Sequence, residues 1–119
     1  MSRINEITTT IADKLKHNNL YVYNVQEMPG VDCGWFEFSH LGHRWNCVIK
    51  ETETNVEFGV SVFMSDEIND CITLTNEDIY GMGSKPENFD VMMTMTYAEL
   101  SATIYHLSIK AGLVVPSMF

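Results

Sequence analysis

Basic residues are scarce in this sequence, and their scarcity limits what the chain can bind. The 119 residues include seven Lys or Arg against sixteen Asp or Glu, which gives a net charge of −9. Residues 51–99 hold eleven of the acidic residues and a single base, Lys85. Proteins use Lys and Arg to bind both nucleic-acid phosphates and acidic lipid surfaces. We therefore expect no direct binding to nucleic acid and no binding to a membrane.

Long apolar runs and paired cysteines are also missing. No uncharged apolar run approaches the roughly 18 residues of a membrane-spanning helix. The first residues lack the apolar core of a signal peptide. The three cysteines cannot all pair with one another, and their spacing matches no disulfide framework. We expect a reduced, cytoplasmic protein.

What the sequence does contain is the composition of one globular domain. Its length is close to the commonest domain size, and 45% apolar with 19% charged residues is typical of a folded chain. It has no internal repeat and no segment that resembles a linker. We predict a single domain over residues 1–119.

The N-terminal region shows first a helical and then a strand pattern. Ser2 can cap a helix, and Asn18-Asn19 can end it in a left-handed conformation. Between them, four apolar residues recur at helical spacing: Ile4, Ile7, Ile11 and Leu15. Residues 20–27 follow as a predicted strand. One face of that strand is predicted to hold Tyr21, Tyr23 and Val25.

Residues 33–50 alternate between apolar and polar side chains on both sides of Leu41-Gly42, a suitable two-residue hairpin loop. With this loop, the pairs on the apolar face are His40 with His43, Phe38 with Trp45, and Phe36 with Cys47. The opposite face is largely polar, and a register shifted by one residue would mix the two kinds of side chain. The alternation therefore predicts both the hairpin and its register.

The same apolar face continues into the next two strands. Residues 56–65 alternate as the hairpin does, and residues 71–75 form a short strand after them. A turn at Thr52-Glu53 would join the hairpin to the longer of these strands. It is predicted to pair Ile49 with Val56, Cys47 with Phe58, and Trp45 with Val60.

A loop over residues 76–88 and a last strand over residues 89–95 are predicted next. The alternation of this last strand would turn Met93 and Met95 into the core and leave Met92 on the other face, available for contacts. We expect the apolar residues 113–119 at the end of the chain to pack on the core or on a partner.

A capping box from Thr96 to Glu99 would start the C-terminal helix, which Gly112 would end. Its predicted apolar stripe consists of Leu100, Ile104, Leu107 and Ala111. In an alternative interpretation the helix begins near Asp90. The predicted fold class is α+β, an antiparallel β-meander of about five strands with an N-terminal and a C-terminal helix packed on its apolar face.

Two cysteines and two histidines share one short stretch: Cys33, His40, His43 and Cys47. Structural zinc sites use these residue types. The predicted register places Cys33 and Cys47 on opposite faces, however, and two histidines are too few for a zinc site. We therefore predict no metal and no cofactor. The chain has no catalytic motif and we expect a non-enzyme, with a small-ligand or enzymatic module around His40 and His43 as an alternative.

The acidic residues of the second half fall mainly on predicted connections between elements. Seven of them are the predicted partner-binding residues: Asp66, Glu67, Asp70, Glu77, Asp78, Glu87 and Asp90. If these connections lie at neighbouring ends of the sheet, the carboxylates form one negative field that faces a basic protein. The alternative is that they only make the surface soluble.

These properties favour a small, acidic, non-catalytic protein-binding module. Proteins with large basic surfaces mostly handle nucleic acid, so an acidic module can compete with phosphates for that surface. We expect an inhibitor or nucleic-acid decoy that blocks such a protein, for example a nuclease, as viral anti-defence proteins do. The alternative is a cytoplasmic chaperone or adaptor that acts as a homodimer.

Overall fold

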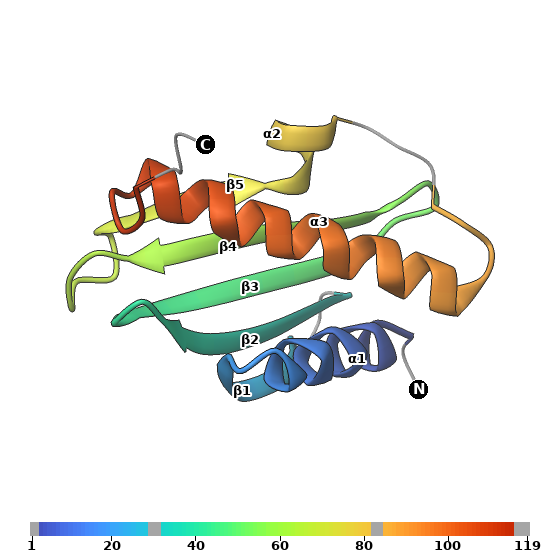
Figure 1. Ribbon diagram of the computed structural model, residues 1–119. Helices are drawn as coiled ribbons and strands as arrows, with labels where there is room; N and C mark the ends of the chain where they lie inside the picture. The colour runs from blue at the N-terminus through green and yellow to red at the C-terminus, as the bar shows by residue number, and fades with distance from the viewer. Residues whose placement is uncertain (1–2, 29–31, 82–84, 116–119) are drawn as a thin grey trace.

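The protein is a two-layer structure in which two helices cover one face of a five-stranded sheet (Figure 1). The computed structural model describes residues 3–28, 32–81 and 85–115. The elements are α1 (Arg3–His17), β1 (Tyr21–Met28), β2 (Cys33–His40), β3 (His43–Glu51), β4 (Val56–Phe63), β5 (Cys71–Thr75), α2 (Asn76–Tyr80) and α3 (Phe89–Lys110). The strands are antiparallel neighbours in sequence order. The predicted α+β meander with two covering helices is confirmed.

Helix α1 packs as its periodicity predicts. All four residues of its predicted apolar face are buried: Ile4, Ile7, Ile11 and Leu15. Asn19 has a φ of 69°, so a left-handed residue follows the helix as expected. The predicted N-cap Ser2 lies outside the described residues.

The β2–β3 hairpin has the predicted register. His40 pairs with His43, and every predicted pair back to Cys33 with Lys50 is present. Leu41 and Gly42 both have positive φ, at 54° and 75°, as a type I′ turn requires. The apolar side chains of this face are fully buried: Phe36, Phe38, Trp45 and Cys47. Alternation determined the register because a slip by one residue would bury the polar face.

The predicted pairing of β3 with β4 is wrong by two residues. Ile49 pairs with Phe58, and Cys47 pairs with Val60. The turn lies one residue later than predicted, at Glu53-Thr54: Thr52 N donates to Asn55 O at 2.9 Å, and the Thr52 hydroxyl accepts from Asn55 N at 3.0 Å. A shift of two keeps the same side chains on the apolar face, so alternation alone could not detect it.

The predicted apolar face of β1 is also wrong. Val22 is buried, whereas Tyr21 is exposed. The strand has a register shift between Tyr23 and Gln26, with Asn24 at a φ of 53°. This bulge reverses the alternation, so Val25 packs against the core although Tyr21 does not.

Residues 89–95 form the first turns of α3 and not a strand, which corrects the prediction in favour of the alternative helix start. The side-chain oxygen of Asn88 caps the helix by accepting from the N–H of Val91 at 3.0 Å. The buried residues follow helical spacing: Met92, Met93, Thr96, Leu100, Thr103, Ile104, Leu107 and Ser108. Thr96 is therefore inside the helix and not its cap, while Met92 is buried and Met95 is exposed, the reverse of the prediction.

The predicted loop over residues 76–88 begins with the short helix α2. Thr75 and Asp78 form a capping box, in which the Thr75 hydroxyl accepts from the Asp78 N–H at 3.2 Å and the Asp78 carboxylate accepts from the Thr75 N–H at 2.9 Å. Asn76 fixes this helix to β4, because its amide donates to Val56 O at 2.8 Å and accepts from Phe58 N at 3.1 Å.

Close contact between α1 and β2 depends on Gly34. A Cβ atom at this position would lie 1.7 Å from Thr8 Oγ1 and 2.7 Å from Thr8 Cβ. The Thr8 hydroxyl cannot turn away freely, since it donates to Ile4 O at 2.7 Å. Any side chain at position 34 must therefore push the helix away from the sheet.

We predict that Gly34→Ala lowers the free energy of unfolding by about 1–3 kcal/mol, the usual cost of overpacking a core. Gly59→Ala is the matched control on β4, because the nearest atom to its added Cβ is Thr75 Cγ2 at 3.8 Å. Urea unfolding should show little change for the control. Thr8→Ala in the Gly34→Ala background should recover part of the loss, and no recovery would contradict the steric explanation.

Candidate functional site

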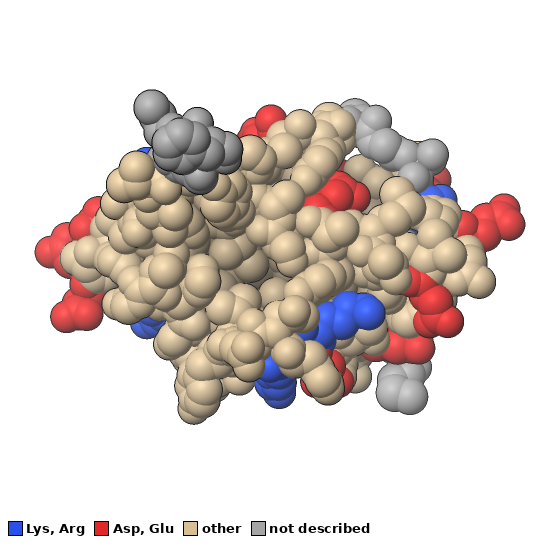
Figure 2. All heavy atoms as spheres, in the orientation of Figure 1, with Lys and Arg blue, Asp and Glu red and all other residues tan. Residues whose placement is uncertain are grey.

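The seven predicted partner-binding carboxylates do not form one surface. The β4–β5 connection, with Asp66, Glu67 and Asp70, lies at the end of the sheet where β4 finishes (Figure 1). Glu87 and Asp90 lie at the opposite end, because Lys85 N donates to Thr54 O in the loop before β4 begins. Figure 2 shows acidic side chains at both ends of the molecule. The expectation of a single negative field is not met.

The other two predicted residues lie on α2, beside β5. Glu77 and Asp78 are both exposed. The capping hydrogen bonds with Thr75 hold the pKa of the Asp78 carboxyl below its ordinary value, with a smaller contribution from the charge of Lys110. Asp78 therefore stabilises the start of α2.

We call the end of the sheet with the β2–β3 turn and the β4–β5 connection the Leu41/Ile68 end, after the two aliphatic residues exposed there. Ile68 is 74% exposed and Leu41 is 43% exposed. Asp66, Glu67 and Asp70 flank Ile68, and all three are exposed. Among the described residues, none of these three carboxylates takes part in an ion pair.

The β4–β5 connection has a defined shape. Met64 N donates to Asp70 O at 2.8 Å and closes the loop, and Asp70 N donates to Glu67 O at 3.1 Å inside it. The Ser65 hydroxyl accepts from Glu67 N at 3.2 Å. These hydrogen bonds are made by other residues of the loop. They fix the loop backbone, and the Ile68 side chain is left exposed.

A shallow pocket of about 300 Å³ separates this loop from the β2–β3 turn. Its lining includes Gly42 and His43 on one side and Met64 and Asp66 on the other. His43 Nδ1 lies 3.0 Å from the backbone oxygen of Phe63, where it can hydrogen-bond. This contact joins the end of the β2–β3 turn to the end of β4, where the β4–β5 connection starts.

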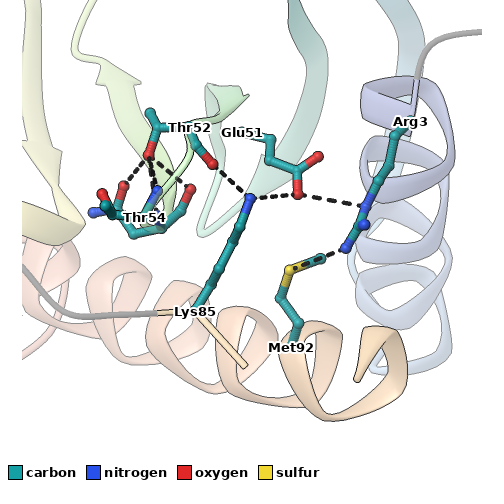
Figure 3. A network of polar contacts seen from close by, with 7 residues as sticks. Arg3, Glu51, Thr52, Thr54, Lys85 and Met92 are labelled. Atoms are coloured by element: carbon teal, nitrogen blue, oxygen red, sulfur yellow. Dashed lines mark hydrogen bonds and ion pairs between the residues drawn. The ribbon is translucent and has the colours of Figure 1, made fainter. Parts of the chain in front are cut away.

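The opposite end of the sheet contains an internal ion network centred on Glu51 (Figure 3). Glu51 Oε2 lies 2.9 Å from Lys85 Nζ and 3.4 Å from Arg3 Nε. Lys85 Nζ also donates to Thr52 O, and Arg3 Nη2 lies 3.5 Å from Met92 Sδ. Lys85, the single base of residues 51–99, is thus used to join the loop before α3 to the β3–β4 loop.

A cleft of about 410 Å³ lies between α2 and α3. Glu99 lies on its α3 side, and Asn76 and Tyr80 lie on its α2 side. Partial burial raises the pKa of the Glu99 carboxyl, and a side-chain hydrogen bond with Asn76 opposes this shift. Sequence reasoning missed Glu99 as a site residue because it assigned Glu99 to a helix cap.

The cysteines and histidines of the hairpin do not converge. Cys47 is fully buried, and burial raises the pKa of its thiol far above the ordinary range. Cys33 lies opposite Lys50 at the other end of the hairpin from His40 and His43. Within the described part of the chain, no group of three or more His, Cys, Asp or Glu side chains could hold a metal ion.

His40 lines a separate cleft of about 430 Å³ with mostly apolar walls, including Leu20, Tyr97 and Ile104. Burial lowers the pKa of the His40 imidazole. His43 lines the shallow pocket at the Leu41/Ile68 end, so the two histidines face different hollows. The alternative of one shared site around them gains no support from this arrangement.

Comparisons with known proteins found no matching family model, no matching curated protein and no matching solved structure. Among the helices of the described residues, none has the length and apolar character needed to cross a membrane.

We predict that Glu99→Gln stabilises the protein more at pH 7 than at pH 4. The raised pKa means that the folded state holds the Glu99 proton more tightly than the unfolded state, so this contribution to stability is lost as pH rises through the folded pKa. Lys85 and Tyr80 are the other titratable groups that line the cleft, and both stay in place. Urea unfolding at the two pH values measures the difference.

Glu87→Gln, which changes an exposed carboxylate outside the cleft, is the control for that comparison. If Glu99→Gln changes the free energy of unfolding equally at both pH values, or more at pH 4, the assigned effect of burial is contradicted.

Proposed function

We propose that this chain is a non-catalytic protein-binding module that binds a basic protein through its Leu41/Ile68 end. The proposed partner belongs to the class of proteins that handle nucleic acid, such as a nuclease, because such proteins present large basic surfaces. The module would then block that surface against nucleic acid.

The observation that carries the proposal is the exposure of Ile68 among three carboxylates without counter-ions. An aliphatic side chain at the centre of a contact can fill a pocket on the partner and contribute affinity. Surrounding carboxylates increase the rate of encounter with a positively charged surface and exclude other partners. Ile68 and its neighbours Asp66, Glu67 and Asp70 combine both properties on one hydrogen-bonded loop.

The two ends of the sheet differ in how their charge is used. At the opposite end, Glu51 is already paired with Arg3 and Lys85, and these pairs hold α1 and the loop before α3 in place. At the Leu41/Ile68 end, Arg44 is the nearby base, and its guanidinium stacks over the Phe63 ring at 4.3 Å from the ring centre. The carboxylates of the β4–β5 loop therefore stay available to a partner.

Two charge-reversed baits with equal changes in net charge test this proposal. One is Asp66→Lys/Glu67→Lys/Asp70→Lys at the Leu41/Ile68 end. The other reverses three exposed carboxylates at the opposite end: Glu53, Glu87 and Asp90. Both baits, and the unmodified chain, are immobilised and exposed to an extract of the native source at low and high salt. Circular dichroism establishes beforehand that each bait is folded.

We expect basic proteins that bind the unmodified chain and the opposite-end bait at low salt but not the Leu41/Ile68-end bait. With one such protein purified, Ile68→Ser should speed dissociation, and the triple reversal should slow association by about tenfold or more. If both baits lose the bound proteins to the same extent, the loss reflects net charge alone and not the Leu41/Ile68 end. Retention by the Leu41/Ile68-end bait, or binding unaffected by salt, would contradict the proposal.

A further inference from the structure

The cleft between α2 and α3 is a separate hollow with its own chemistry, away from the Leu41/Ile68 end. Its walls come from four places in the chain: the start of β4 at Val56, helix α2 with Tyr80, the segment before α3 with Lys85, and helix α3 with Met95 and Glu99. Its volume of about 410 Å³ is within the range of small-molecule sites, which is about 300–1,000 Å³. Figure 2 shows acidic atoms set back between α2 and α3.

Two charged residues line this cleft, and only one of them is neutralised. Lys85 Nζ lies 2.9 Å from Glu51 Oε2 and also donates to Thr52 O, so its charge is directed to the β3–β4 loop (Figure 3). Among the described residues, Glu99 takes part in no ion pair. The cleft therefore holds one carboxylate that lacks a counter-ion.

The polar partner of Glu99 is a neutral amide. The Asn76 amide can donate one N–H to Glu99, while its other N–H donates to Val56 O and its oxygen accepts from Phe58 N. A neutral amide supplies a hydrogen bond but no opposite charge, and a charge-assisted hydrogen bond from a cation is stronger. A ligand that brings a positive charge would supply what the protein does not.

The remaining lining favours an apolar body behind that charge. Met95 is 46% exposed and Tyr80 is 48% exposed, although both lie on helices that pack against the core. Methionine adapts its shape to different ligands, and the face of a tyrosine ring attracts cations. Pro86 and Val56 add apolar surface at the other walls.

We propose that the α2–α3 cleft binds a small organic amine, whose ammonium group pairs with the Glu99 carboxylate and whose apolar stem lies against Met95 and Tyr80. An anion is excluded because it would face Glu99 without a counter-ion. A neutral molecule of the same shape would leave Glu99 uncompensated and lose the charge-assisted hydrogen bonds.

Titration with phenethylamine, followed by NMR of ¹³C-methyl-labelled methionines, tests this inference. We expect saturable shifts of the Met92 and Met95 methyl signals. 2-Phenylethanol, a neutral analogue of the same shape, should bind about tenfold more weakly, since a hydrogen bond to a charged group contributes on that order. Binding of the amine should also weaken as the pH falls through the pKa of the Glu99 carboxyl, because protonation removes the counter-charge.

Glu99→Gln should weaken phenethylamine binding by about tenfold and leave binding of 2-phenylethanol unchanged. Glu87→Gln is the matched control, an exposed carboxylate that does not line the cleft. Equal affinity for the amine and the alcohol in the unmodified protein would overturn the inference, and this comparison needs no variant. Unsaturable shifts, or unchanged amine binding in Glu99→Gln, would also overturn it.

This inference does not depend on the proposed protein partner. The triple reversal at Asp66, Glu67 and Asp70 should leave phenethylamine affinity within about twofold of the unmodified value, because that loop lines a different hollow. Loss of protein binding without loss of amine binding would therefore separate the two surfaces.

Discussion

Burial of one apolar sheet face beneath α1 and α3 is the constraint on which the other features depend. The aromatic side chains at its centre, Phe36, Phe38 and Trp45, are fully buried, and the indole N–H of Trp45 is satisfied by His40 O at 3.0 Å. Because α1 and α3 share this face, each helix must pack close to the strands. Gly34 permits that approach for α1, and the long α3 covers the rest of the sheet from one end to the other (Figure 1).

The position of α3 also decides how charge is distributed. Because the helix begins at Phe89, its first turn lies beside α1, where the Arg3 guanidinium lies 5.4 Å from the centre of the Phe89 ring. Arg3 and Lys85 then converge on Glu51 and neutralise part of the acidity at this end. At the other end the meander places the β4–β5 connection beyond the helices, where its carboxylates are exposed (Figure 1). One end therefore contains an ion network, whereas the other exposes Ile68 among its carboxylates.

The same helix creates the α2–α3 cleft. Helix α2 is fixed to β4 through Asn76 and stands above the edge of the sheet, so it cannot pack fully against α3. Glu99, in the middle of α3, faces the space that remains. The surrounding fold partly shields the Glu99 carboxylate from water. This partial burial raises its pKa, and it is also the physical basis of the proposed affinity for a cation.

Local periods of apolar residues were sufficient to predict the fold class, the buried face of α1 and the register of the β2–β3 hairpin. They could not fix the position of the β3–β4 turn, since a shift of two residues in the pairing preserves the alternation. They were misleading at residues 89–95, where apolar residues satisfy strand and helix periods alike. The grouping of the carboxylates and the isolation of Glu99 were decided only by the tertiary structure, because both depend on which ends of distant elements meet. A local sequence pattern does not specify the distance between two loops of a sheet.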